Sequence, residues 1–199
     1  MISDKTEQLK KIRDEVWNLV ESPLYEYRVR NKYHAVLGEG NHDAKIVFVG
    51  EAPGQKEAET GRPFCGAAGK VLDDLLKSVG LNRKDVYVTN VVKDRPPNNR
   101  DPEPVEIELY SPFLWKQIGI IQPQVIATLG RFSMKFILEK FDLPEKDQSI
   151  SVLHGKALDA IADYGPIVVL PLYHPAVTLH GGVKLDVLKK DFEVLRKIL

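Results

Sequence analysis

The chain has 199 residues, an ordinary length for one globular domain, and its 43% hydrophobic content is enough to build a sizeable core. Basic and acidic residues each number 28, so the formal net charge is zero, which argues against a protein that coats nucleic acid through bulk charge. The single cysteine, Cys65, excludes an internal disulfide and any zinc or iron–sulfur site built from four cysteines. The sequence has neither an apolar run long enough to span a bilayer nor a signal-peptide core, so an intracellular protein is expected.

Apolar patterns along the chain predict alternating helices and strands. An amphipathic helix is expected at residues 2–20, followed by an irregular lead-in at 23–44. Four short apolar runs have the pattern of buried strands and cover residues 45–50, 86–92, 125–129 and 167–172. Helical patterns are expected at 67–79, 104–118, 131–140 and 184–198, with polar loops at 55–66 and 93–104. The alternation predicts an α/β fold: a single-domain α/β/α sandwich over residues 1–199, with a central four-stranded parallel sheet flanked by helices.

A sharp turn, Gly50-Glu51-Ala52-Pro53-Gly54, follows the first predicted strand. Its two glycines and one proline bend the backbone and let it approach a ligand closely. Right-handed crossovers would place the ends of all four strands at one edge of the sheet, where open α/β sheets bind ligands. Asn90, Gly130 and His174 would then lie beside this turn.

Four side chains near this edge could bind a ligand, and each has a structural alternative. The Asn90 carboxamide can pair with the edge of a nucleobase, or it can cap a turn. His174 precedes a proline and can donate a hydrogen bond to an oxygen that gains charge, or it can be a structural histidine. Phe64 can stack on a planar ligand or anchor its loop, and Glu51 can position water or cap the next segment.

The charged residues are unevenly distributed along the chain. Two basic clusters stand out: Arg28, Arg30 and Lys32, and Lys93, Arg95 and Arg100. Composition leaves open whether each is a solvated face or a contact with nucleic acid. The glycines form neither a P-loop nor a Gly-x-Gly-x-x-Gly fingerprint, so a nucleoside triphosphate site has little support.

An ordered set of motifs carries a family resemblance from about Pro23 to the C-terminus. The motifs are Gly50-Glu51-Ala52-Pro53-Gly54, Gly61-Arg62-Pro63-Phe64, Thr89-Asn90-Val91-Val92-Lys93 and His174-Pro175-Ala176. In this order they resemble the family 4 uracil-DNA glycosylases of thermophiles and bacteria. The resemblance implies an enzyme that flips uracil out of DNA and hydrolyses the N-glycosidic bond, which leaves an abasic site for base excision repair.

The resemblance also implies roles for individual residues. Asn90 would read the uracil edge, Phe64 would stack on the ring and His174 would donate to uracil O2. The turn residues Gly50, Glu51, Ala52 and Gly54 would shape the pocket. Glu51 or Glu57 would place the attacking water.

Contacts with DNA are expected from two further segments. Lys93, Arg95 and Arg100 are the basic candidates. In the segment after His174, Val177 and Leu179 are the apolar candidates for a wedge that fills the vacated stack. The expected partner is uracil-containing DNA, double- or single-stranded, bound by a monomer with no membrane association, in the cytoplasm at the nucleoid.

The chain departs from this family at the cysteines that usually hold a [4Fe–4S] cluster. The matching positions carry Leu19, Ser22, Asp94 and Tyr110. We therefore expect no cluster and no other metal or cofactor, with Leu19 and Tyr110 packing there and Ser22 and Asp94 adding polar bonds. Two other functions remain open: a catalytically weak binder of uracil-containing DNA, and a glycosylase for another deaminated base such as hypoxanthine or xanthine.

Overall fold

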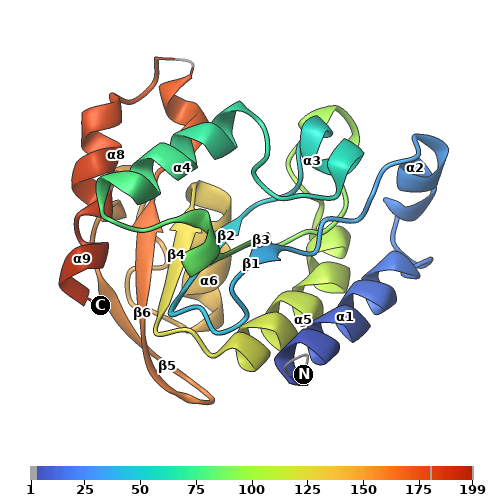
Figure 1. Ribbon diagram of the computed structural model, residues 1–199, viewed down its shortest axis with the longest axis horizontal. Helices are drawn as coiled ribbons and strands as arrows, with labels where there is room; N and C mark the ends of the chain where they lie inside the picture. Colours follow the sequence, from blue (N-terminus) through green and yellow to red (C-terminus); the bar gives the residue numbers. More distant parts are fainter. Residues whose placement is uncertain (1–3, 180, 199) are drawn as a thin grey trace.

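The computed structural model describes residues 4–179 and 181–198, and it has a mixed six-stranded sheet between helices (Figure 1). The strands are β1 (Glu39–Gly40), β2 (Ile46–Gly50), β3 (Tyr87–Asn90), β4 (Val125–Leu129), β5 (Leu158–Ala162) and β6 (Gly165–Leu172). Their order in the sheet is β1-β3-β2-β4-β6-β5. The four central strands are parallel, so the predicted α/β fold and its parallel sheet are confirmed.

Two short antiparallel strands at the edges of the sheet were not predicted. β1 pairs with β3, and β5 pairs with β6. β1 is only two residues long and lies in the segment that was expected to be irregular. β5 is partly exposed, as an edge strand is, so it lacks the continuous apolar run by which the other strands were found.

Helices cover both faces of the sheet. The helices are α1 (Asp4–Trp17), α2 (Tyr25–Arg30), α3 (Gln55–Thr60), α4 (Ala67–Ser78), α5 (Pro104–Ile121), α6 (Arg131–Lys140), α7 (Ile150–Leu153), α8 (Leu185–Phe192) and α9 (Leu195–Ile198). Short 3-10 turns are η1 (Arg83–Asp85), η2 (Pro97–Asn99) and η3 (Pro175–Thr178). Helices α2 and α3 lie in segments expected to be irregular, and the last predicted helix is divided into α8 and α9.

The core has two layers, one on each face of the sheet. Alternate residues of β2 pack in different layers. Val47 and Val49 pack in the layer with α1, α5 and α6, whereas Ile46 and Phe48 pack in the layer with α4, α8 and α9. Phe48 stacks on Phe192 of α8, with ring centroids 5.8 Å apart. This period of two on a strand buried on both faces explains why β2 is continuously apolar. Among the described residues, no helix has both the length and the apolar character needed to cross a bilayer.

Candidate active site

A cavity of about 720 Å³ opens at the carboxyl ends of the parallel strands. Most of the side chains singled out in the sequence line it: Glu51, Ala52, Gly54, Glu57, Phe64, Asn90 and His174. They come from the turn after β2, from α3, from the loop before α4, from the end of β3 and from the segment after β6. Gly50 is buried beneath them. The fold therefore brings these separate segments to one place.

Asn90 ends β3 and is only 2% exposed. It lies opposite Gly50 in the parallel register, and the amides of Val91 and Val92 donate to the carbonyls of Gly50 and Glu51. A Cβ atom at residue 50 would lie 2.3 Å from Asn90 Oδ1 and 2.9 Å from Phe64 Cζ. Only glycine lets the turn, the carboxamide and the aromatic ring approach this closely.

Phe64 is held in an unusual backbone conformation, with φ of 49°. The first turn of α4 packs against its main chain so tightly that a Cβ atom at Gly69 would lie 1.6 Å from Phe64 O. The Phe64 ring lies 5.6 Å from the His174 ring, centroid to centroid, and is 8% exposed. The ring therefore forms a fixed wall of the cavity, and the residue is held in a sparsely populated backbone conformation to keep it there.

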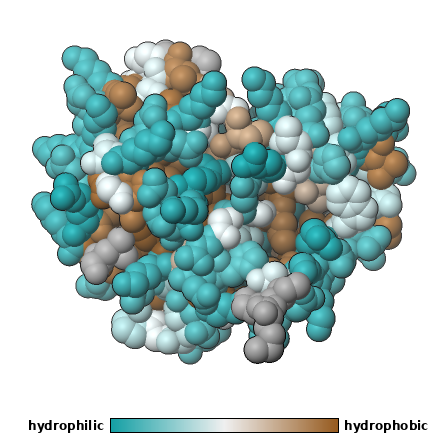
Figure 2. Space-filling view, in the orientation of Figure 1, coloured by the Kyte–Doolittle hydropathy of each residue, from teal (hydrophilic) through white to brown (hydrophobic). Residues whose placement is uncertain are grey.

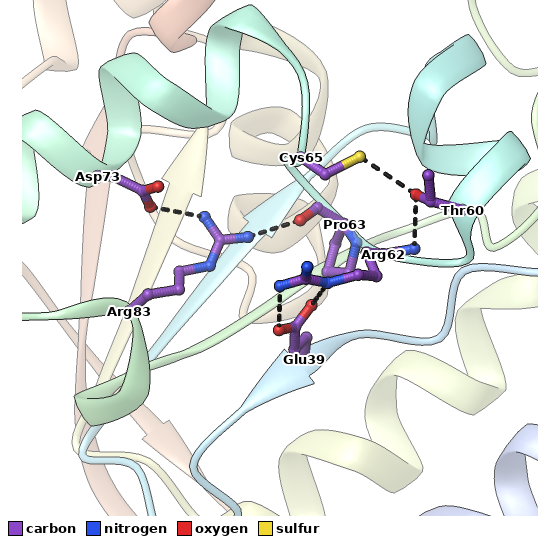
Figure 3. Close-up of polar contacts among 7 residues, drawn as sticks. All are labelled: Glu39, Thr60, Arg62, Pro63, Cys65, Asp73 and Arg83. Atoms are coloured by element: carbon purple, nitrogen blue, oxygen red, sulfur yellow. Dashed lines mark hydrogen bonds and ion pairs between the residues drawn. The ribbon is translucent and has the colours of Figure 1, made fainter.

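Polar contacts on both sides of Phe64 fix its loop (Figure 3). Arg62 makes two hydrogen bonds to the Glu39 carboxylate of β1, at 2.9 and 2.8 Å. Arg83 donates to the Pro63 carbonyl at 2.6 Å and pairs with Asp73 of α4. The loop is thus tied to the edge of the sheet and to the helix that follows it.

His174 is oriented by its own turn. The amide of Ala176 donates to His174 Nδ1 at 3.2 Å, so the imidazole proton is assigned to Nε2. A Cβ atom at Gly130, which has φ of 99°, would lie 3.2 Å from His174 Cβ. Burial lowers the pKa of His174, with a smaller opposing effect from Glu57. The group is therefore a neutral histidine with one N–H donor left for a ligand.

Two of the carboxylates that line the cavity, those of Glu51 and Glu57, are held in different ways. Glu57 accepts from the amide of Gly66 at 3.3 Å, which ties α3 to the start of α4. Burial, followed by the charge of Asp101, raises the pKa of Glu51. The Glu51 carboxylate makes no hydrogen bond to any other residue that the structure describes. It is therefore the freer of the two groups.

The basic candidates for DNA contact lie in different surroundings. The prediction that Lys93 contacts DNA is wrong, because its side chain is fully buried and its ammonium is surrounded by protein oxygens. Arg95 donates to Asn99 and to the Tyr33 hydroxyl. Arg100 makes two hydrogen bonds to the buried Glu106 carboxylate. DNA contacts by Arg95 and Arg100 stay predictions.

The two apolar candidates lie on η3 and directly after it. Val177 packs against the core layer of α4 and α8, whereas Leu179 is 46% exposed. Figure 2 shows hydrophobic side chains at the top of the molecule, where Figure 1 has the loop between η3 and α8. Leu179 is thus the accessible one of the two.

Sequence reasoning missed part of the cavity wall. Gln55, Lys56 and Glu59 of α3 line the cavity, as does Asn99, whose φ is 52°. The 55–66 segment was expected to be a loop because α3 spans only six mainly polar residues and has one buried apolar side chain, Ala58. The glycines on either side of it, Gly54 and Gly61, were the available signal for its caps.

The positions where related proteins would carry cluster cysteines are joined by direct contacts. The Tyr110 hydroxyl donates to Asp94 Oδ2 at 2.6 Å and lies 2.8 Å from Ser22 Oγ. Leu19 packs against the core layer that contains Tyr110. These predicted contacts are confirmed. One partner was not foreseen: Arg28 donates to Asp94 Oδ2 at 3.0 Å and to the carbonyl of Trp17 at 2.7 Å.

This donor set does not fit an iron–sulfur cluster. Its oxygens are already bonded to one another and to a guanidinium, and the sole thiol, Cys65, lies beside Thr60 in the Phe64 loop. Within residues 4–179 and 181–198, no group of three or more histidine, cysteine, aspartate or glutamate side chains is arranged to hold a metal ion.

Comparison with known proteins identifies the class that this fold and cavity belong to. Residues 37–196 match the family model of the uracil DNA glycosylase superfamily. The chain is 45% identical to the type-4 uracil-DNA glycosylase of Sulfurisphaera tokodaii, over 96% of this chain and 85% of that protein. It is 43% identical to the type-4 enzyme of Saccharolobus solfataricus, over 97% of this chain and 87% of that one.

A bacterial relative is similarly close. The type-4 uracil-DNA glycosylase of Thermotoga maritima is 45% identical over 76% of this chain and 74% of its own length. The chain therefore belongs to the type-4 uracil-DNA glycosylases, hydrolases of N-glycosyl bonds that remove uracil from DNA.

Proposed function

We propose that the cavity holds the flipped uracil between Phe64, Asn90 and His174. Phe64 stacks on the ring, the Asn90 carboxamide pairs with the uracil edge, and His174 Nε2 donates to O2. The observation that carries this proposal is the convergence of these three side chains on one cavity, with Asn90 and Phe64 both packed on Gly50.

The chemistry requires an extruded base because the scissile bond is buried in the base stack. Unstacking costs a few kcal/mol, which contacts in the cavity and to the backbone must offset. When the N-glycosidic bond breaks, its electron pair goes to uracil N1 and the sugar becomes an oxocarbenium-like cation. A fixed neutral donor such as His174 stabilises the negative charge that spreads to O2, and loss of such a donor costs about 100- to 1,000-fold in rate.

We assign the attacking water to Glu51 rather than Glu57. The raised pKa of Glu51 reflects burial in the cavity, and its carboxylate is free of other hydrogen bonds among the described residues, whereas Glu57 already holds Gly66. Glu51→Gln should therefore slow the release of uracil more than Glu57→Gln does. Equal rates for the two variants would contradict this assignment.

DNA would lie across the mouth of the cavity. The protein would act as a monomer, in the cell compartment that contains the DNA. Leu179 is our choice for the wedge because it is exposed, and Val177 would support it from below. Arg95 and Arg100 would contact phosphates in addition to the partners that they already have.

We also propose that the protein contains no iron–sulfur cluster. The contacts among Ser22, Asp94, Tyr110 and Arg28 support this, because they put oxygens that are already hydrogen-bonded within the protein where the cysteine thiolates of a cluster would lie. Iron and sulfide analysis of the purified protein tests the proposal, and stoichiometric iron and sulfide would refute it.

Cleavage assays test the site itself. Duplex and single-stranded oligonucleotides that contain uracil, hypoxanthine or xanthine are incubated with the protein and then treated with alkali. We expect strand breaks at uracil, and we expect them to fall at least 100-fold for Asn90→Ala and for His174→Ala. Asn31→Ala, which changes an exposed asparagine after α2, is the control. Unchanged cleavage by both site variants would refute the assignment.

A further inference from the structure

Lys93 is buried directly behind the residue that ends β3 in the cavity. Its side chain has no measurable exposure. Its Nζ lies 2.6 Å from the carbonyl oxygen of Asn90, 2.8 Å from Thr89 Oγ1 and 2.6 Å from Gln117 Oε1 of α5. Burial of a lysine in such a position costs free energy, so its contacts must offset that cost or serve a function.

The three partners all act as hydrogen-bond acceptors. Thr89 Oγ1 donates its own proton to the carbonyl of Leu37 at 2.6 Å, so its oxygen is free to accept. The Gln117 amide nitrogen donates to Leu37 O and lies 3.0 Å from the Tyr87 hydroxyl, which turns Oε1 toward Lys93. The neutral amine of a lysine has two N–H groups, whereas its ammonium form has three and can satisfy all three acceptors.

The ammonium has no carboxylate against it within the described part of the chain. The next residue, Asp94, faces the other way and pairs with Arg28. Burial alone pushes the pKa of Lys93 well below its ordinary value, and the three acceptors oppose that shift by stabilising the charged form. The three acceptors around Nζ favour the charged form, and no carboxylate in the described part of the chain lies against it to balance that charge.

This charge lies behind the cavity wall, beside Thr89 and α5, and contacts the wall through the main chain of Asn90. Lys93 Nζ bonds to the main-chain oxygen of Asn90, and the Asn90 side chain lines the cavity. Standard backbone dimensions put the ammonium about 8 Å from a base that pairs with the carboxamide. Little water separates the two, because the Asn90 and Thr89 side chains are 2% and 0% exposed.

We propose that Lys93 is a positioning residue for uracil release: its buried ammonium fixes Asn90 and supplies the positive charge beneath the cavity that favours departure of uracil as an anion. The proposal rests on the assignment of Asn90 to the uracil edge. As the bond between N1 and the sugar breaks, the electron pair stays on N1, and the charge behind the ring lowers the free energy of that state. A unit charge at about 8 Å in an effective dielectric of about 20 changes the rate by roughly 10- to 30-fold.

Two variants separate the charge from the geometry. Lys93→Met keeps most of the side-chain volume but removes both the charge and the hydrogen bond to Asn90. Gln117→Glu leaves Lys93 and its bond to Asn90 in place and puts a carboxylate against the ammonium, so it cancels the charge, although it also removes the amide donor to Leu37 O. Lys84→Met, at an exposed lysine in η1 before the opposite end of β3, is the matched control.

The measurement is the single-turnover release of uracil and of 5-fluorouracil from otherwise identical single-stranded oligonucleotides. Fluorine stabilises the N1 anion, so the fluorinated base needs less help from the protein. We expect Lys93→Met and Gln117→Glu to slow uracil release by at least tenfold and 5-fluorouracil release clearly less, with little change in DNA affinity. Lys84→Met should behave as the wild type.

Several outcomes would overturn the inference. A Gln117→Glu variant with wild-type rates would refute the role of the charge, and equal losses on both bases would mean that Lys93 only maintains structure. Circular dichroism checks that each variant is folded. If Lys93→Met is unfolded, the conclusion is drawn from Gln117→Glu alone. His174→Ala in the same assay separates the two proposals. If His174→Ala releases uracil slowly while Lys93→Met and Gln117→Glu are as fast as the wild type, only the inference about Lys93 fails. If His174→Ala is as fast as the wild type too, the site assignment fails.

Discussion

Removal of Arg28 tests the joint formed by Ser22, Arg28, Asp94 and Tyr110, whose buried contacts connect α2, α5 and the segment after β3. The side chains of Arg28 and Asp94 are 4% and 1% exposed, and Arg28 Nε lies 3.0 Å from Asp94 Oδ2. Arg28→Met keeps an unbranched side chain that can still pack between the rings of Trp17 and Tyr25, each 5.0 Å from the guanidinium carbon. The variant therefore removes the charge and its hydrogen bonds but little of the packing.

The expected loss of stability is large because a carboxylate is left buried without its counter-ion. Breaking one partner of a buried ion pair costs about 3–5 kcal/mol. In a domain of this size, 1 kcal/mol corresponds to about 2–4 °C in Tm, so Tm should fall by roughly 6–20 °C. Arg30→Met, at an exposed arginine of the same helix, should change the free energy of unfolding by less than about 0.5 kcal/mol.

The pH dependence gives a second and sharper readout. Burial raises the pKa of Asp94, and Tyr110 and Arg28 oppose that rise. Without Arg28 the pKa rises further, so the folded variant binds a proton more readily than the unfolded chain does. The cost of the buried charge is then present above the folded pKa and is relieved as pH falls through it. The difference in stability between the variant and the wild type should shrink from about pH 8 to about pH 5.

Urea denaturation followed by circular dichroism measures both quantities. The slope of the free energy against urea should be the same for the wild type and both arginine variants, so that differences in midpoint report stability. Two results would refute the reasoning: Arg28→Met as stable as Arg30→Met, or a gap that widens as the solution is acidified.

Three further predictions follow from the cavity. Gly50→Ala should abolish uracil release, because its Cβ would meet Asn90 Oδ1 at 2.3 Å, whereas Gly119→Ala, with open space around it, should leave cleavage unchanged in the same assay. Because burial lowers the pKa of His174 from 6.5, the free energy of unfolding should fall as pH drops below 6.5 through the folded pKa, and His174→Gln should lose that part of the dependence in denaturation midpoints measured against pH. Leu179→Ala should slow cleavage of duplex by about 3- to 10-fold and leave single strands unaffected, since only the duplex has a vacated stack to fill; equal effects on both substrates would contradict its role as a wedge.

The sequence predicts the central sheet well because the physical signal there is strong. β2 and β4 are buried on both faces, and each appears as an uninterrupted apolar run whose end was placed within a residue. The predicted second strand was too long at its C-terminal end: Val91 and Val92 are just as apolar, but their amides bond to the turn after β2 instead of extending β3. Apolar character marks burial, and it does not report where a strand stops.

Charge proved harder to interpret than apolar patterning. Arg28 and Lys93 belong to clusters that look basic and solvated in the sequence, yet both side chains are buried. Their acceptors come from residues far along the chain, Asp94 for Arg28 and Gln117 for Lys93, so no local pattern reveals them. The cavity itself was easier to foresee, because the carboxyl ends of parallel strands must meet wherever the crossovers are right-handed.

The joint formed by Ser22, Asp94, Tyr110 and Arg28 has a consequence for how the protein matures and ages. It is made of oxygen and nitrogen groups of the chain itself, so its contacts form as the chain folds. It contains no thiolate that an oxidant could attack. What holds it is an ion pair and a phenol, so its strength depends on the charge of Asp94 and not on the redox state of a sulfur ligand.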